Sequence, residues 1–248
     1  MYPLAHLFFT QKLFGFLDRP LALGSIFPDM IISSGLSWIK SHSLGCNLWQ
    51  LFKDRNKNLQ HFSLGVITHG VEPKGLDYYS DEKYKHYERG YCFEKAKPLI
   101  DKVIQACSLS REDGWWKAHN FIEMSVELYI YEKYPHLLTV LRETFADTSL
   151  IKEIIREVSV YLELESSLIE KSADLFSEFA LKEPSDAYSL ASRFQSQEYF
   201  KNSISAMDLE ESREVIEEGR RLIYPDIEDF FAHVHQKILP LLKPISGI

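Results

Sequence analysis

Cysteine is scarce in this sequence, which argues against a disulfide-stabilised fold. The 248 residues include three cysteines, Cys46, Cys92 and Cys107, without a paired spacing or a C-x-x-C motif. Isolated cysteines of this kind are typical of buried thiols in a reducing compartment. We therefore expect buried free thiols and, by default, a cytoplasmic protein.

Long hydrophobic runs are also missing. No stretch reaches 18 consecutive apolar residues, so the sequence predicts no membrane-spanning helix. The apolar start lacks a basic leader and contains His6, Gln11 and Lys12. We expect it to form the first helix, Pro3–Leu17, rather than a signal peptide.

Positive charge is in deficit, with 28 lysines and arginines against 36 aspartates and glutamates, a formal net charge of −8 and a pI near 5.6. Because proteins bind nucleic-acid phosphates through lysine and arginine, a nucleic-acid duplex is not expected as the partner. An anionic membrane surface is disfavoured for the same reason. A small phosphoester or lipid substrate that is bound through metal ions remains compatible with this charge.

Glycine and proline are few, at 11 and 10 residues, and the alternating pattern of strands is absent. Apolar residues recur at helical spacing along most of the chain, which predicts a single all-α domain, a bundle of about ten helices. Residues 1–134 would form a metal-binding core with a cleft, and residues 135–248 would complete the bundle. Nothing in the sequence indicates an oligomeric state.

Proline positions and apolar spacing predict where several helices begin and end. Pro28 is expected to push Phe27 out of helical geometry, and Pro98 to kink or divide a helical region over Asp81–Leu109. Six amphipathic helices are predicted after Pro135: Leu137–Phe145, Ser149–Leu162, Ser166–Ala180, Pro184–Ser205, Leu209–Ile223 and Ile227–Leu242.

A helix predicted over Arg111–Tyr134 carries the first candidate metal ligands. It is apolar almost all round, so we expect it to be buried. His119 and Glu123 lie one turn apart on one of its faces, a spacing that lets both side chains reach one ion. A buried carboxylate without a partner is costly. A hydrogen-bonded core pair is the alternative interpretation.

The segment spanning residues 59–81 supplies the second set of candidates. Its apolar helix ends at His69, and the glycine- and proline-containing loop that follows bears Glu72, Asp77 and Asp81. We expect His69 to ligate a metal and to face the His119 segment across one site. A histidine that caps the helix terminus is the alternative.

Four other polar residues are ambiguous by sequence alone. Asp29 either caps a turn or ligates a metal. His6, His42 and His61 could each be a metal ligand or a hydrogen-bonded histidine of the core. The apolar neighbours of His6 are more typical of a core histidine.

Two aromatic pairs, Tyr78-Tyr79 and Trp115-Trp116, also allow two interpretations. They could line a pocket for an organic substrate, although packing in the core is the more ordinary role of such pairs.

The order of these residues resembles the zinc-dependent phospholipase C family. The match extends over about the first 130 residues and includes an early histidine, GSIFPD at 24–29, FSLGVITH at 62–69 and the later His-x-x-x-Glu. That family is all-α, binds up to three zinc ions in a cleft and hydrolyses phosphodiesters of phospholipids. The resemblance implies these metal ligands: His6, Asp29, His42, His69, His119 and Glu123.

This chain departs from the family pattern at two places. The family's Leu-Gly helix continues as His-x-x-x-Asp, whereas Pro73 stands four residues after His69. Glu72 or Asp77 would therefore have to bridge the metals or act as the catalytic base. Secreted members also use a processed N-terminal amine as a ligand, which is not expected here. We expect one or two ions, zinc or another divalent metal, rather than three.

These features predict a metal-dependent hydrolase that acts on a phosphodiester or phospholipid-like substrate through a metal-activated water. The alternative is a non-catalytic helical metal-binding or interaction protein that retains the scaffold. A histidine-aspartate-type phosphohydrolase, also all-α, is ranked last because no histidine in the chain is followed by aspartate.

Overall fold

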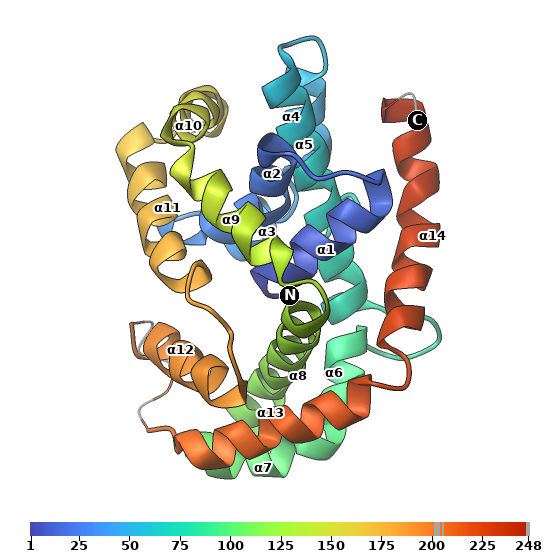
Figure 1. The fold of residues 1–248 in the computed structure, drawn as a ribbon, viewed down its shortest axis with the longest axis vertical. Coiled ribbons are helices and arrows are strands. Elements are labelled where there is room, and N and C mark those ends of the chain that lie inside the picture. Colours follow the sequence, from blue (N-terminus) through green and yellow to red (C-terminus); the bar gives the residue numbers. More distant parts are fainter. Residues whose placement is uncertain (201–203, 205, 247–248) are drawn as a thin grey trace. The chain divides into compact units, whose positions relative to one another are not determined.

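The computed structural model describes residues 1–200, 204 and 206–246, and every regular element within these residues is helical (Figure 1). The α-helices are α1 (Pro3–Phe14), α2 (Arg19–Met30), α3 (Trp38–Ser41), α4 (Gly45–Phe52), α5 (Lys57–His69), α6 (Tyr91–Ala96), α7 (Ile100–Cys107), α8 (Arg111–Lys133), α9 (His136–Ala146), α10 (Thr148–Leu162), α11 (Ser166–Ala180), α12 (Ala187–Phe200), α13 (Leu209–Ile223) and α14 (Ile227–Ser246). The all-α prediction is confirmed for these residues. They contain more helices than the ten expected, because the N-terminal half includes short helices such as α3 and α6.

The predicted effect of proline was right at one position and wrong at another. Pro98 lies in a 3₁₀ turn, Lys97–Leu99, that divides α6 from α7 as expected. Pro28, in contrast, lies inside α2. Asp18 caps this helix by accepting a hydrogen bond from the Leu21 amide at 3.1 Å. The proline falls in the last turn of a buried helix, so its missing amide leaves most of the hydrogen bonds intact.

Two further expectations have mixed outcomes. Cys92 and Cys107 are buried free thiols as expected, whereas Cys46 is exposed. The helix predicted over Pro184–Ser205 begins at Ala187, and its predicted end at Ser205 lies outside the described residues. Within the described part of the chain, no helix combines the length and apolar character needed to cross a membrane.

The chain divides into two compact units, and each unit is assembled from segments that are distant in sequence. Unit 1 comprises residues 1–5, 79–135 and 182–231. Unit 2 comprises residues 6–78, 136–181 and 232–248. Both units therefore draw on the N-terminal and the C-terminal half of the sequence.

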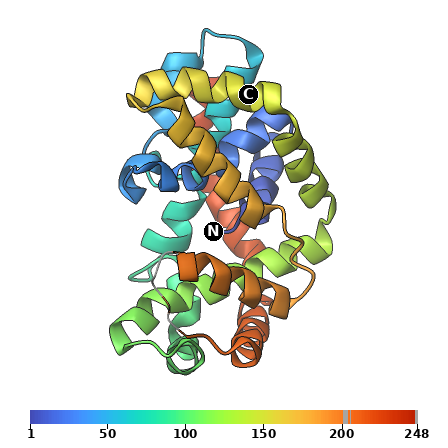
Figure 2. The same ribbon diagram turned by 90° about the vertical axis from the view of Figure 1, so that its left-hand side faces the viewer.

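Unit 2 is built on the close packing of α2 against α5. Two glycines permit this approach: a Cβ on Gly24 would lie 1.9 Å from the Phe62 carbonyl oxygen, and a Cβ on Gly65 would lie 2.3 Å from that of Leu21. The hairpin of α10 and α11, which faces the viewer in Figure 2, covers part of this pair. The core of unit 2 includes buried side chains from α2, α5, α10 and α11, among them Phe27, Phe62, Ile154 and Ile169.

Unit 1 is organised around α8, against which α6, α7 and α13 pack (Figure 1). Ser110 caps the start of α8 by accepting a hydrogen bond from the Asp113 amide at 3.0 Å. The buried Ser125 hydroxyl lies between α8 and α13 and donates to the Ile216 carbonyl at 2.8 Å. Residues 121–130 are buried, which confirms the prediction of a largely buried helix.

Candidate metal centre

Unit 2 brings together two histidines and two aspartates from four separate elements. Asp29 lies in the last turn of α2, His42 directly follows α3, and His69 ends α5. Asp77 comes from the loop after α5 and is 2% exposed. One ligand atom from each of the four residues lies within 4.8 Å of the others. We call these four residues the four-residue group.

Five distances between ligand atoms of the four-residue group lie near the edge length expected for a tetrahedral site. His69 Nε2 lies 3.0 Å from Asp77 Oδ2, 3.2 Å from His42 Nε2 and 3.8 Å from Asp29 Oδ1. His42 Nε2 lies 3.2 Å from Asp77 Oδ2 and 3.3 Å from Asp29 Oδ1. Four ligands at typical zinc bond lengths would be about 3.3–3.4 Å apart. The donor set and these five distances show that the group could hold a metal ion.

Backbone carbonyl groups fix both imidazole rings of the four-residue group. His69 Nδ1 donates to the Ser25 carbonyl at 2.7 Å, and His42 Nδ1 donates to the Trp38 carbonyl at 2.9 Å. These hydrogen bonds to Nδ1 direct the Nε2 atom of each ring toward the group. Such outer hydrogen bonds are the usual way in which proteins orient metal-binding histidines.

His6 lies beside the four-residue group and shares Asp77 with it. Its ring stacks on that of His69, with centroids 3.7 Å apart, and its Nε2 lies 3.3 Å from Asp77 Oδ1. The Asp77 carboxylate thus offers one oxygen to His6 and the other to His42 and His69. Burial and the neighbouring His69 lower the pKa of His6 to about 4, which keeps its ring neutral at neutral pH.

Charge interactions also shift the pKa values of His42, Asp29 and Asp77. Burial disfavours the charged form of His42, but the Asp29 and Asp77 carboxylates outweigh this effect and raise its pKa to about 9. Burial likewise disfavours both carboxylates, yet nearby positive charges, the adjacent histidines among them, hold the pKa of Asp29 and that of Asp77 below the ordinary range. Both aspartates are therefore ionised at neutral pH.

Unit 1 contains a second candidate group, formed by Asp81, His119 and Glu123. We call it the three-residue group. Asp81 lies in a single π-helical turn, Tyr78–Glu82, and the other two side chains lie one turn apart on α8 as the sequence predicts. Ligand atoms from the three residues lie within 4.8 Å of one another.

Neighbouring groups also orient the three-residue group. His119 Nδ1 donates to the Trp116 carbonyl, and its Nε2 lies 3.3 Å from Asn120 Nδ2. Asn120 Nδ2 donates to Glu123 Oε2 at 3.2 Å, and the Met1 backbone nitrogen lies 3.1 Å from Glu123 Oε1. Burial lowers the pKa of His119 and so favours the neutral ring that binds metals.

Five of the six predicted ligands belong to these groups: Asp29, His42 and His69 to the four-residue group, and His119 and Glu123 to the three-residue group. His6 lies beside the four-residue group and belongs to neither. The sequence places Asp81 among the carboxylates of the loop after His69 but assigns it no ligand role, because no motif marks it, and the fold of its turn brings it to His119. Of the two carboxylates proposed to replace the missing aspartate, Asp77 lies in the four-residue group. Glu72 is exposed and belongs to neither group.

His61 has a different partner from His69, although both lie on α5. Its Nδ1 lies 2.6 Å from Asp18 Oδ2, the carboxylate that caps α2. We therefore find a structural role for His61 in fastening the start of α2 to α5.

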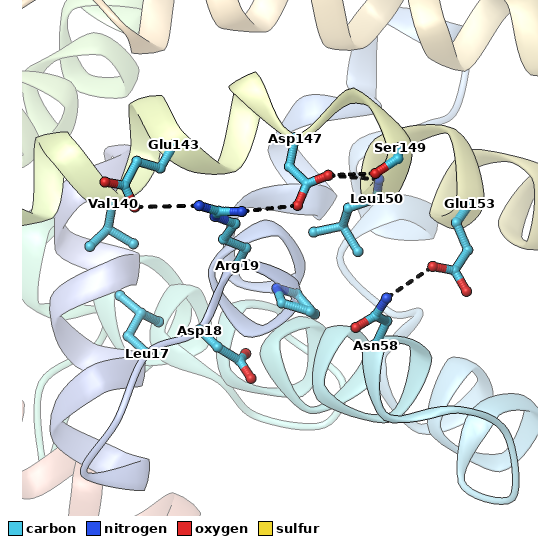
Figure 3. Close-up of a pocket in the computed structure, with 11 residues that line it drawn as sticks. Leu17, Asp18, Arg19, Asn58, Val140, Glu143, Asp147, Ser149, Leu150 and Glu153 are labelled. Atoms are coloured by element: carbon cyan, nitrogen blue, oxygen red, sulfur yellow. Dashed lines mark hydrogen bonds and ion pairs between the residues drawn. The ribbon is translucent and has the colours of Figure 1, made fainter.

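A surface hollow of about 500 Å³ lies in unit 2, and none of its lining residues belongs to the four-residue group (Figure 3). Arg19 reaches into it and pairs with Asp147 at 3.3 Å and with Glu143 at 3.9 Å. Asn58 donates to Glu153 at 3.0 Å (Figure 3). These acidic side chains are thus already partnered within the hollow.

Comparison with known proteins gave no family model, no curated protein and no solved structure that matches this chain.

Proposed function

We propose that this chain is a metal-dependent hydrolase that cleaves a phosphoester, with a phosphodiester or a phospholipid-like molecule as the substrate class. The observation that carries the proposal is the difference between the two groups. Asp29, His42, His69 and Asp77 supply four protein ligands, whereas the three-residue group supplies three. A four-coordinate zinc site with four protein ligands is closed, and one with three keeps a position for water or substrate.

The donor types favour zinc among the common divalent metals, because imidazole and carboxylate ligands are combined in both groups. An ion at the three-residue group would supply Lewis-acid polarisation of a phosphoryl oxygen and a water of lowered pKa. Two neighbouring groups of the chain would orient the ligands of this ion. The Trp116 carbonyl fixes the His119 ring, and Asn120 holds the Glu123 carboxylate.

Asp77 has the central position in unit 2 within this proposal. Its two carboxylate oxygens face His6 on one side and the His42–His69 pair on the other. We assign it as the carboxylate that replaces the aspartate missing after His69. Glu72, which is exposed, receives no role at the metal.

A non-catalytic metal protein is the second candidate, and the closed four-residue group favours it. A fully ligated ion would stabilise unit 2 without binding a substrate. The two candidates differ at the three-residue group, which is needed for hydrolysis and not for a structural ion in unit 2.

Metal analysis and turnover separate these candidates. Protein purified without a metal-affinity tag is expected to hold at least about one equivalent of zinc, which His69→Ala loses and His61→Ala keeps. Hydrolysis of bis-p-nitrophenyl phosphate is expected to depend on zinc and to be lost in His119→Ala. His86→Ala, a change in an exposed loop, is the matched control and keeps activity. Metal-loaded wild-type protein without turnover would favour the non-catalytic candidate.

A further inference from the structure

Arg89 lies in the loop between Glu82 and Tyr91, and three aromatic rings surround its guanidinium group. The guanidinium carbon lies 4.6 Å from the centroid of Phe93 and 5.6 Å from the centroids of both Trp115 and Trp116. Stacking of this kind holds a planar cation in place at a small cost in conformational entropy. The side chain is 30% exposed, so the charge is accessible from solvent.

The guanidinium group of this arginine has one buried donor without a hydrogen-bond partner among the described residues and one distant ion pair. Its Nε is buried and has no hydrogen-bond partner there. The nearest carboxylate oxygen, on Glu82, lies 3.8 Å from Nη1, which is beyond hydrogen-bond distance, and that side chain is 41% exposed. Arginine presents five donors in a rigid fork that matches the oxygens of a phosphate or carboxylate.

Two contacts link Arg89 to the three-residue group. The next residue, Gly90, donates its amide to the Asp81 carbonyl at 3.1 Å, and a Cβ at Gly90 would lie 2.2 Å from the Asp81 nitrogen. The Phe93 ring that stacks on the guanidinium also stacks on His119, with centroids 4.2 Å apart and planes at 17°. Asp81 and His119 are therefore positioned by the same loop and ring that position Arg89.

The aromatic cluster is already filled by the protein's own cation. An empty cluster of Phe93, Trp115 and Trp116 would suit a quaternary ammonium group. With Arg89 inside it, the cluster instead presents a positive charge, and the guanidinium group has an Nε donor without a hydrogen-bond partner among the described residues. Trp116 is 49% exposed, so a ligand can approach from its side.

We propose that Arg89 forms an anion subsite beside the three-residue group and selects phosphoesters whose leaving or head group carries a further negative charge. This inference rests on the proposed hydrolase function and names its substrate class. A phosphomonoester, or a phosphodiester with an anionic head group, carries two negative charges. One would lie at an ion held by the three-residue group and the other at the guanidinium group.

Binding of inorganic phosphate to zinc-loaded protein tests the subsite without reference to turnover. Phosphate is titrated while tryptophan fluorescence is recorded, because Trp115 and Trp116 contact the arginine. Arg89→Gln is expected to weaken phosphate binding by about tenfold or more, since a hydrogen-bonded charge pair is lost. Arg89→Lys keeps the charge without the fork and is expected to recover only part of that loss.

Arg213→Gln is the matched control, because it removes the same charge from unit 1 at a surface site that pairs with Glu210. It is expected to leave phosphate affinity unchanged. An equal loss of phosphate affinity in Arg213→Gln and Arg89→Gln would show that only the net charge of the protein matters, and would overturn the proposal. Unchanged phosphate affinity in a folded Arg89→Gln protein, shown by circular dichroism, would also overturn it.

Substrate comparison completes the test and separates this inference from the hydrolase proposal. Arg89→Gln is expected to lower kcat/KM for p-nitrophenyl phosphate, a dianion, at least fivefold more than for bis-p-nitrophenyl phosphate, a monoanion. Equal losses for the two substrates would contradict the subsite while the hydrolase proposal stands. Arginine-dependent phosphate binding without any zinc-dependent turnover would support the subsite and refute the hydrolase.

Discussion

Asp77 shows how one side chain connects several candidate ligands. The sequence leaves two carboxylates to replace the aspartate expected four residues after His69. The loop after α5 folds so that Asp77 is buried between His6 and the His42–His69 pair, and Glu72 remains at the surface. A buried carboxylate is stable only with several partners, and the three histidines supply them.

Asp77→Asn and Glu72→Gln are therefore expected to behave differently. Loss of the Asp77 charge should lower zinc affinity in unit 2 by more than about tenfold, since removing even an outer partner of a metal ligand costs about 10–100-fold. Glu72→Gln should leave affinity unchanged. Competition with a chromogenic zinc chelator measures both. Equal affinities for Asp77→Asn and wild type would remove Asp77 from the ligand set.

At the scale of single residues, the sequence predicts which residues are candidate ligands better than it predicts which of them lie together. His119 and Glu123 could be paired in advance because both lie on one helix with a fixed periodicity. The sequence marks Asp81 only as one of several carboxylates on the loop after His69, because its approach to His119 depends on a π-helical turn and on the contact of Gly90 with that turn. Motif spacing carries information within an element and little across a loop.

Among the helices, the α2–α5 pair positions two members of the four-residue group. Asp29 and His69 lie at the ends of these two helices, and the Ser25 carbonyl of α2 accepts the Nδ1 proton of His69 at 2.7 Å. Gly24 and Gly65 lie at the crossing, where neither position has room for a Cβ. The GSIFPD and FSLGVITH motifs each contain one of these glycines, so helix packing explains part of each motif.

Gly65→Ala is expected to disturb both stability and metal binding. The new Cβ would lie 2.3 Å from the Leu21 carbonyl oxygen and 2.7 Å from the Ser25 nitrogen, so the helices must separate. Overpacking of this kind costs about 1–3 kcal/mol. We expect that loss in urea unfolding together with weaker zinc binding. Lys57→Ala, an exposed change on the same helix, is the control, and equal stability of the two variants would contradict the packing argument.

Pro28 shows where local rules fail at the scale of an element. A proline disfavours helical geometry in the residue before it, so the sequence predicts that Phe27 leaves the helix. Residues 21–28 of α2 are all buried, and Asp18 caps the start of the helix. Packing of the buried face therefore outweighs the local preference, which sequence reasoning cannot weigh without knowing the neighbours of the helix.

At the scale of the whole molecule, the two units do not follow the division of the sequence at residue 134. Each unit takes segments from both halves, so residues 1–134 contain only part of either core. In unit 2, Phe27 and Phe62 belong to the same core as Ile154 and Ile169 of α10 and α11. In unit 1, α8 lacks its α13 neighbour in such a fragment.

A fragment of residues 1–134 is thus expected not to fold, even though it holds every candidate ligand. Without α10, α11 and α13, the apolar faces of α2, α5 and α8 would be exposed to water at about 25 cal/mol per Å² of apolar surface. Urea titration followed by circular dichroism should show no cooperative transition, and zinc should bind weakly because the ligands are not positioned. Mixing with a 135–248 fragment is expected to restore the transition. Cooperative unfolding and tight zinc binding by the isolated 1–134 fragment would instead show that the N-terminal half is a self-sufficient metal-binding core.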